Sequence, residues 1–236
     1  MSLRDRLNER LRDRRVTTMV RRLLDDYLPP VIREWRPLNR WMASTFHGPA
    51  FDLDFKEHAF QMSPREFADA YAALDAGHGR YRDTDTTPAQ IAAICEAARG
   101  RVLEVGSGNG AVAAALVESG RDVTALEVTH GSAAETARRA RCTVALASLP
   151  YLPFADAAFD TVVCAHTLEH VTDLYASARE LRRVARRVIV VVPRQRYYRY
   201  TVDYHLHFFP SAAPLEHLLD GHARDVDGDW FVLSDR

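Results

Sequence analysis

The stretch RVLEVGSGNGAV, Arg101–Val112, decides the fold of this chain. It starts with a short, mainly apolar run and continues with three glycines in five positions. Glycine adopts backbone conformations that other residues avoid, and it lets a ligand approach the backbone closely. The stretch therefore predicts a buried strand over 101–105, a tight loop beside a ligand pocket, and a helix over about 110–119.

The sequence after this stretch alternates between apolar runs and amphipathic segments. The runs DTVVCA and VIVVV are apolar at almost every position, as expected of parallel strands that helices cover on both faces. Strands that alternate with helices predict an α/β fold with a doubly wound, mostly parallel sheet. The expected strands are 101–105, 122–128, 142–147, 159–165, 188–192, 223–227 and 230–234. The expected helices are about 88–99, 110–119, 131–140, 172–185 and 211–220.

The N-terminal part of the chain has helical rather than alternating character. An amphipathic helix is predicted over 1–28 from the spacing of Leu3, Leu7 and Leu11, and the following Pro29-Pro30 pair is expected to end it. Residues 31–62 are rich in aromatic side chains and are expected to be irregular.

A second N-terminal helix begins at a capping signal. Ser63 followed by Pro64 and Glu66 predicts a capping box for a helix that ends near residue 75. We expect two domains, an N-terminal helical cap and lid over 1–85 and a core over 86–236.

Composition limits the classes of function. The 236 residues carry a formal net charge of -1, which argues against a nucleic-acid partner. The three cysteines have no paired spacing and indicate reduced thiols, and no apolar run reaches the ~18 residues that span a bilayer. We therefore expect a cytoplasmic protein without a membrane partner. The Arg-rich helix over 1–28 is a candidate homodimer contact.

The glycine loop alone leaves two cofactors open. GSGNGA also satisfies the G-x-G-x-x-G/A fingerprint of dinucleotide-binding proteins, so NAD and S-adenosylmethionine compete. The downstream stretch LPYLPFADAAFDTVVCAHTLEHV distinguishes them. Together, E-x-G-x-G-x-G, L-P-F…F-D-x-V and L-E-H resemble the class I S-adenosylmethionine-dependent methyltransferases, in particular the small-molecule, type 11-like group. The resemblance covers about 88–193 and implies a Rossmann-like methyltransferase core.

The resemblance implies a set of cofactor contacts. The glycine loop would pass under the methionine part of S-adenosylmethionine, and Glu127 would accept the two ribose hydroxyls. Glu104, inside the strand, is placed to receive the cationic amino group. Ser148 stands where the family carries an acid for the adenine amino group, which is a departure from the pattern. The expected cofactor residues are Glu104, Gly106, Ser107, Gly108, Gly110, Glu127, Val128, Ser148, Leu149 and Tyr81.

Histidines gather where a catalytic base is needed. Methyl transfer to a hydroxyl requires positioning of the acceptor and removal of a proton. His166 and His170 follow the fourth strand of the core, and His205 and His207 follow the fifth. Since the carboxyl ends of parallel strands meet at one edge, all four are candidates for a general base.

A metal ion is an alternative to a base acting alone. The run HTLEH resembles the E-x-x-E-H of small-RNA 2′-O-methyltransferases and ubiquinone-pathway O-methyltransferases, which bind a divalent ion. The resemblance implies His166, Glu169 and His170 as ligands, with His207 or His205 completing the set. His166 stands where those families have Glu, which favours a softer metal or none. Such an ion would assist methylation of a ribose or phenol-like hydroxyl.

The segment PRQRYYRYTVDYHLHFF, 193–209, is the candidate acceptor reader. Arginine can grip phosphate or carboxylate, and tyrosine stacks on rings, so Arg196, Tyr200 and Tyr204 are expected substrate contacts. The composition favours a sugar, a sugar phosphate or a natural-product intermediate, although aromatic packing would also explain it. The remaining alternatives are a non-catalytic cofactor-binding subunit and a nicotinamide oxidoreductase.

Overall fold

The computed structural model describes residues 27–47, 51–77, 84–200 and 204–236. The chain divides into two compact units. One unit comprises Met1–Asp85 with Gln195–Tyr204, and the other comprises Thr86–Arg194 with His205–Arg236. We call them the N-terminal unit and the sheet unit. Residues 195–204 thus group with the N-terminal unit although they follow the fifth strand in sequence.

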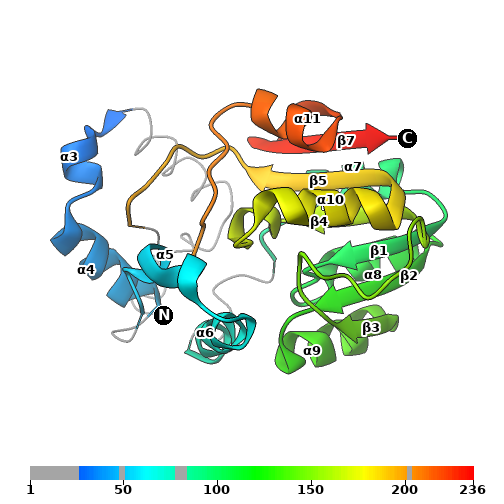
Figure 1. The fold of residues 1–236 in the computed structure, drawn as a ribbon, viewed down its shortest axis with the longest axis horizontal. Helices are drawn as coiled ribbons and strands as arrows, with labels where there is room; N and C mark the ends of the chain where they lie inside the picture. The colour runs from blue at the N-terminus through cyan, green and yellow to red at the C-terminus, as the bar shows by residue number, and fades with distance from the viewer. Residues whose placement is uncertain (1–26, 48–50, 78–83, 201–203) are drawn as a thin grey trace, which may run out of the picture. The chain divides into compact units, whose positions relative to one another are not determined.

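The sheet unit is built on a seven-stranded sheet with the order β3-β2-β1-β4-β5-β7-β6 (Figure 1). The first five strands run parallel, while β7 pairs antiparallel with both β5 and β6. The strands are β1 Arg101–Val105, β2 Asp122–Glu127, β3 Thr143–Leu146, β4 Phe159–Ala165, β5 Ala185–Pro193, β6 His222–Val226 and β7 Asp229–Asp235. The α/β, mostly parallel fold predicted from the alternating pattern is confirmed.

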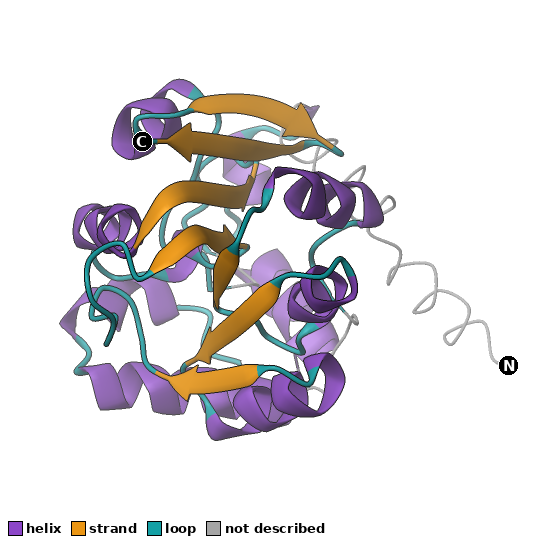
Figure 2. Ribbon diagram, turned by 90° about the vertical axis from the view of Figure 1, so that its right-hand side faces the viewer, coloured by secondary structure: helices purple, strands orange, loops and turns teal. Residues whose placement is uncertain are grey.

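Helices cover both faces of this sheet, as Figure 2 shows. They are α7 Pro88–Ala97, α8 Ala111–Glu118, α9 His130–Ala140, α10 Leu174–Val184 and α11 Ala213–Leu219, together with the short 3-10 helix η2 Leu168–His170. One core lies under α10 and α11 and contains Leu103, Val162 and Leu181. The other lies under α7 and α8 and contains Val102 and Val163. Neighbouring strand residues alternate between the two cores, which explains why the runs are apolar at every position.

The strand order places a crevice at a defined edge of the sheet. β1 lies between β2 and β4, so the chain leaves the carboxyl ends of β1 and β4 in different directions. Ligands of open α/β sheets bind at such a point, beyond the carboxyl ends of the strands. The glycine loop follows β1 and η2 follows β4, so both lie at this edge.

The N-terminal unit is helical over residues that we expected to be irregular. Its elements are α3 Pro30–Arg33, α4 Arg36–His47, α5 Phe55–His58, the 3-10 helix η1 Ala59–Gln61, and α6 Pro64–Gly77. The prediction for 31–62 was therefore wrong over most of its length. Among the side chains of α4 whose burial is described, Asn39 and Ala43, one turn apart, are buried, and α4 is amphipathic at the helical period.

The capping box of α6 is confirmed. The Ser63 backbone N–H donates to the Glu66 carboxylate at 2.8 Å, and the Glu66 N–H donates to the Ser63 hydroxyl at 3.3 Å. The helix predicted over 1–28, with its proposed dimer contact, lies almost entirely outside the described residues. Among the helices that are described, none is long and apolar enough to cross a membrane.

Candidate functional site

The loop after β1 is shaped by three glycines with positive φ, at +73° for Gly106, +59° for Gly108 and +78° for Gly110. A Cβ at Gly106 would lie 2.2 Å from Thr167 Oγ1, and one at Gly110 would lie 2.8 Å from Thr136 Cα. A Cβ at Gly108 would meet no described atom within 4 Å. Gly106 and Gly110 therefore serve internal packing, and Gly108 alone faces open space. This corrects the expectation that all three glycines make room for a ligand.

Glu127, the last residue of β2, holds this loop in place. Its carboxylate accepts hydrogen bonds from the Gly108 N–H and, at 3.1 Å, from the Val128 N–H. On the other side of the loop, the buried Thr136 hydroxyl donates to the Gly108 carbonyl at 3.1 Å. The Ser107 and Thr136 hydroxyls lie 3.0 Å apart, within hydrogen-bond distance. Gly108 is thus fixed from both sides, with the Glu127 carboxylate directly beside it.

Glu104 is a second carboxylate beneath the same loop. It is 2% exposed in β1, and its Oε2 accepts no hydrogen bond within the described residues. Burial raises its pKa well above the usual value, and the Glu127 charge raises the pKa further, although the Ala113 backbone N–H opposes both. Two buried carboxyl groups thus lie beneath the loop, and Glu104 Oε2 has no hydrogen-bond partner within the described residues.

The expected adenine end has a polar atom but no acid. Ser148 is exposed, its hydroxyl donates to the Leu149 carbonyl at 2.9 Å, and its backbone pairs with Tyr151 in an isolated bridge. The Leu149 side chain is buried in the core under α10. Since the Ser148 hydroxyl already donates, its oxygen is left as an acceptor for an amino group. Tyr81, the remaining expected cofactor residue, lies outside the described residues.

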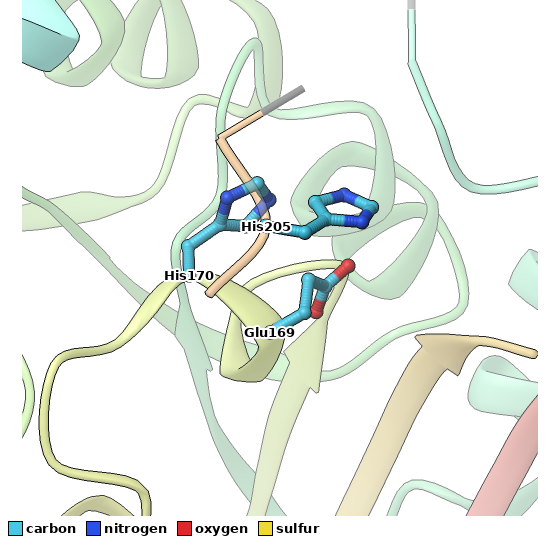
Figure 3. Close-up of side chains that lie close together, drawn as sticks. All are labelled: Glu169, His170 and His205. Carbon is cyan, nitrogen blue, oxygen red and sulfur yellow. The ribbon is translucent and has the colours of Figure 1, made fainter. Parts of the chain in front are cut away.

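Glu169, His170 and His205 form a cluster at the same edge of the sheet, which we call the carboxylate–histidine cluster. One possible ligand atom from each of the three side chains lies within 4.8 Å of the other two. The rings of His170 and His205 meet edge to face with centroids 4.8 Å apart. Figure 3 shows the three side chains pointing toward one another, two from η2 and one from the segment after β5.

The charge of Glu169 is set by its histidine neighbours. Burial alone would raise the pKa of this carboxyl, but His166, His170 and His205 outweigh burial and hold the pKa below its usual value. Glu169 is 1% exposed, and neither carboxylate oxygen accepts a hydrogen bond within the described residues. Its Oε1 lies 3.6 Å from His166 Nδ1. The cluster therefore presents a buried carboxylate anion between two imidazoles.

The other two candidate histidines contact residues outside the carboxylate–histidine cluster. His166 Nε2 lies 3.4 Å from Gln90 Oε1 and 3.9 Å from Asp229 Oδ2, so His166 stands behind Glu169. His207 Nε2 lies 2.8 Å from the Val171 carbonyl oxygen, and its proton must therefore be donated to that oxygen. Burial lowers the pKa of His207, which favours the neutral ring.

The structure divides the residues that were implied as metal ligands. The resemblance implied His166, Glu169 and His170 with His207 or His205, as an alternative to no metal. The structure brings Glu169, His170 and His205 together. Within the described residues, the group of ligand atoms that lie within 4.8 Å of one another does not include His166 or His207.

The expected acceptor contacts have different environments. Arg196 is exposed and Tyr200 is half-buried, so both can meet a ligand. Tyr204 is instead part of the aromatic core of the N-terminal unit, 5% exposed and stacked on Phe55 with ring centroids 4.0 Å apart. Phe51 stacks on Tyr204 at 4.9 Å. The stacked rings give Tyr204 a packing role in this core, and its contact with an acceptor stays a prediction.

Three polar residues at this edge, of which Gln90 and Asp229 are buried and Thr167 is half-buried, were not found from the sequence. Thr167 packs against Gly106, and Gln90 donates from Nε2 to Asp229 Oδ2 at 3.0 Å. Gln90 is also the third residue of α7 in a capping box with Thr87, and the spacing T-P-x-Q would have revealed that much. No local signal indicates Thr167 or Asp229, since only the strand order brings them here.

Comparison with known proteins gives a consistent result. Residues 103–189 match the family model described as "Methyltransferase domain". Over 87 residues the chain is 36% identical to the demethylmenaquinone methyltransferase of Beutenbergia cavernae, covering 36% of this chain and 36% of that protein. The chain thus matches about a third of the length of this relative.

Solved structures share the fold at low identity. A SAM-dependent methyltransferase from Methanosarcina mazei is 15% identical with a TM-score of 0.50, over 61% of this chain and 96% of that one. A structure described as a complex between the Haloferax volcanii Trm112 methyltransferase activator and a putative methyltransferase gives 14% identity and a TM-score of 0.55. That match covers 73% of this chain and 97% of the other. At these identities the likeness shows the fold.

The roles of two glycines can be separated by substitution. Gly106→Ala should lower the free energy of unfolding by about 1–3 kcal/mol more than Gly108→Ala does, because its Cβ would collide with Thr167. Both positions have positive φ, so the backbone strain is shared. Urea denaturation measures the difference, and adding Thr167→Ala should recover part of the loss at Gly106. Equal destabilisation by both alanines would contradict the packing role.

Glu104 should make stability depend on pH. Because the pKa of Glu104 is raised in the folded state, its contribution to the free energy of unfolding is fully present below the unfolded-state pKa of 4.5. This contribution is lost as pH rises toward the pKa of the folded state. Glu104→Gln removes this decline, so it should stabilise the free protein more at about pH 8 than at about pH 5. Urea denaturation at both pH values tests this, with the exposed Glu118→Gln as control. An equal effect of Glu104→Gln at the two pH values would refute the raised pKa.

Proposed function

We propose that this chain is a class I S-adenosylmethionine-dependent methyltransferase that transfers a methyl group from that cofactor to a hydroxyl oxygen of a small polar acceptor. One observation carries the proposal. Gly108, at the carboxyl edge of the sheet, faces open space with the Glu127 carboxylate beside it. A nucleoside that carries a cationic side chain matches this combination of open backbone and negative charge.

The residues present fit the cofactor. The methionine part would pass Gly108, where no described atom would meet a Cβ. Its ammonium group would face Glu104, whose Oε2 accepts no hydrogen bond within the described residues and whose charge is otherwise destabilised. The ribose hydroxyls would donate to Glu127, whose carboxylate is already an acceptor for backbone N–H groups of the loop. Ser148 would accept from the adenine amino group.

When bound, S-adenosylmethionine supplies a methyl carbon that its sulfonium has already activated. The chain must then hold the acceptor oxygen in line with the carbon–sulfur bond and take up the proton of the acceptor hydroxyl. We assign the proton to the carboxylate–histidine cluster, where the Glu169 anion stabilises a positive imidazole on His170 or His205. The acceptor O–H bond breaks, the oxygen–carbon bond forms, and the pair of the carbon–sulfur bond stays on sulfur. The imidazole then returns its proton to water.

The acceptor class is proposed from the segment that follows β5. Exposed Arg196 offers a planar cation for phosphate or carboxylate, and Tyr200 offers a ring for stacking. These two side chains favour a sugar, a sugar phosphate or another small polar intermediate. A subunit that binds the cofactor without turning it over is the competing function. It would bind the cofactor normally and methylate none of the hydroxyl compounds offered.

Binding of S-adenosylhomocysteine tests the cofactor site. Gly108→Val should abolish binding, because the side chain would fill the space beside Gly108. Isothermal titration gives the affinity, and thermal shift provides a second readout. At about 100 times its Kd the ligand should stabilise the wild-type chain by ~2.7 kcal/mol and the variant by nothing measurable.

The matched control is Gly120→Val. Gly120 also has a positive φ, at +82°, and a Cβ there would also meet no described atom within 4 Å, but it precedes β2 at the opposite edge. Gly120→Val should therefore share the backbone strain and keep the affinity. Normal binding by Gly108→Val, or equal loss in both variants, would overturn the placement of the cofactor. Stabilisation by NADH in place of S-adenosylhomocysteine would overturn the proposed function.

A further inference from the structure

We infer that Glu169, His170 and His205 bind one divalent transition-metal ion, and that the ion in turn binds the hydroxyl oxygen of the acceptor. The inference rests on the proposed function for the identity of the acceptor. The metal site itself rests only on the cluster. One carboxylate and two imidazoles form a donor set that suits zinc and its neighbours in the first transition row.

The geometry of the cluster is close to that of a bound site. The three ligand atoms lie within 4.8 Å of one another. Around a tetrahedral ion with ligand distances of about 2.1 Å, the ligand atoms lie about 3.4 Å apart. Small side-chain rotations would close this difference. Three protein ligands leave a coordination position open, which is the arrangement of catalytic rather than structural zinc sites.

A second observation points to a cation independently of the spacing. Glu169 is 1% exposed, yet neither of its carboxylate oxygens accepts a hydrogen bond within the described residues. The lone pairs of both oxygens therefore remain as acceptors at a buried position. The contact to His166 Nδ1 at 3.6 Å is longer than a hydrogen bond. A cation held between Glu169 and the two histidines would supply the missing partner.

Backbone hydrogen bonds already hold the two ligand segments together. The Glu169 carbonyl accepts from the Leu206 N–H at 2.8 Å and from the His207 N–H at 2.9 Å. These bonds fix the segment after β5 against η2, so that His205 is held opposite Glu169 without an ion. Behind Glu169, His166 lies between it and Asp229, and Gln90 donates to Asp229. Such outer contacts orient ligands in metal sites.

An ion in this position would change how the acceptor loses its proton. The hydroxyl oxygen would occupy the open position, and the charge of the ion would lower the pKa of that hydroxyl. The proton leaves to water, the oxygen attacks the methyl carbon as an anion, and the carbon–sulfur pair remains on sulfur. His170 and His205 would then act as neutral ligands and not as proton acceptors.

The test is direct metal binding by the full chain without a polyhistidine tag. The protein is stripped with EDTA, dialysed, and titrated with Zn²⁺ by calorimetry and with Co²⁺ by visible absorption. His170→Asn changes the least buried ligand, and Glu169→Gln removes the anion while keeping the shape. His217→Asn is the control, because His217 is an exposed histidine on α11 outside the cluster. Melting curves establish that each variant is folded.

One ion per chain should bind to the wild type and to His217→Asn with equal affinity. His170→Asn and Glu169→Gln should each weaken binding by roughly 100-fold or more and remove the Co²⁺ absorption of the site. No one-to-one binding by the wild type, or unchanged affinity in both variants, would overturn the inference.

Titration of S-adenosylhomocysteine in the same samples separates the two proposals. A chain that binds the nucleoside but no metal overturns the metal site and leaves the proposed function standing. A chain that binds metal in the cluster but no nucleoside supports the metal site and overturns the proposed function.

Discussion

Burial of the Glu104 carboxyl inside β1 is the constraint on which the site depends. Burial raises the pKa of Glu104 well above its usual value, and the charge of Glu127, on the neighbouring parallel strand, raises it further. The sheet does not offset this cost, since Glu104 Oε2 has no hydrogen-bond partner in the described part of the chain. Free energy lost here in the unliganded protein becomes available to a cationic ligand, and it explains why an acid stands inside an otherwise apolar strand.

Topology joins this pocket to the carboxylate–histidine cluster. Because β1 and β4 are neighbours, the loop after each strand packs against the other, and Thr167 fills the space that a side chain at Gly106 would need. The Thr167 hydroxyl lies 3.3 Å from the Val105 carbonyl, to which it donates. Two residues later, the backbone carbonyl of Glu169 accepts hydrogen bonds from the Leu206 and His207 N–H groups, in the segment that carries His205. The glycine loop, η2 and the segment after β5 therefore form one packed edge.

Local patterns were sufficient for the fold of the sheet unit but not for every side chain of the site. Apolar runs and the glycine loop predicted the strands because burial on both faces leaves a periodic signal. Whether His205 or His207 lies beside Glu169 and His170 depends on the path of the chain after β5, which no local pattern encodes. A packing role and a ligand contact could not be distinguished for Tyr204, because an aromatic core and an aromatic ligand site have the same composition. In 31–62, the aromatic content was interpreted as irregular chain although α4 is amphipathic at the helical period, so this helix was missed.

The measurement that tests the central claim is the number of protons released when S-adenosylhomocysteine binds. Calorimetry near neutral pH in buffers of different ionisation enthalpy provides this number. If the ammonium group relieves the Glu104–Glu127 repulsion, Glu104 ionises on binding, so the wild-type chain releases protons and Glu104→Gln releases fewer. Binding with no proton release, or with equal release in both proteins, would contradict the account of the pocket as a cation site built on two carboxylates.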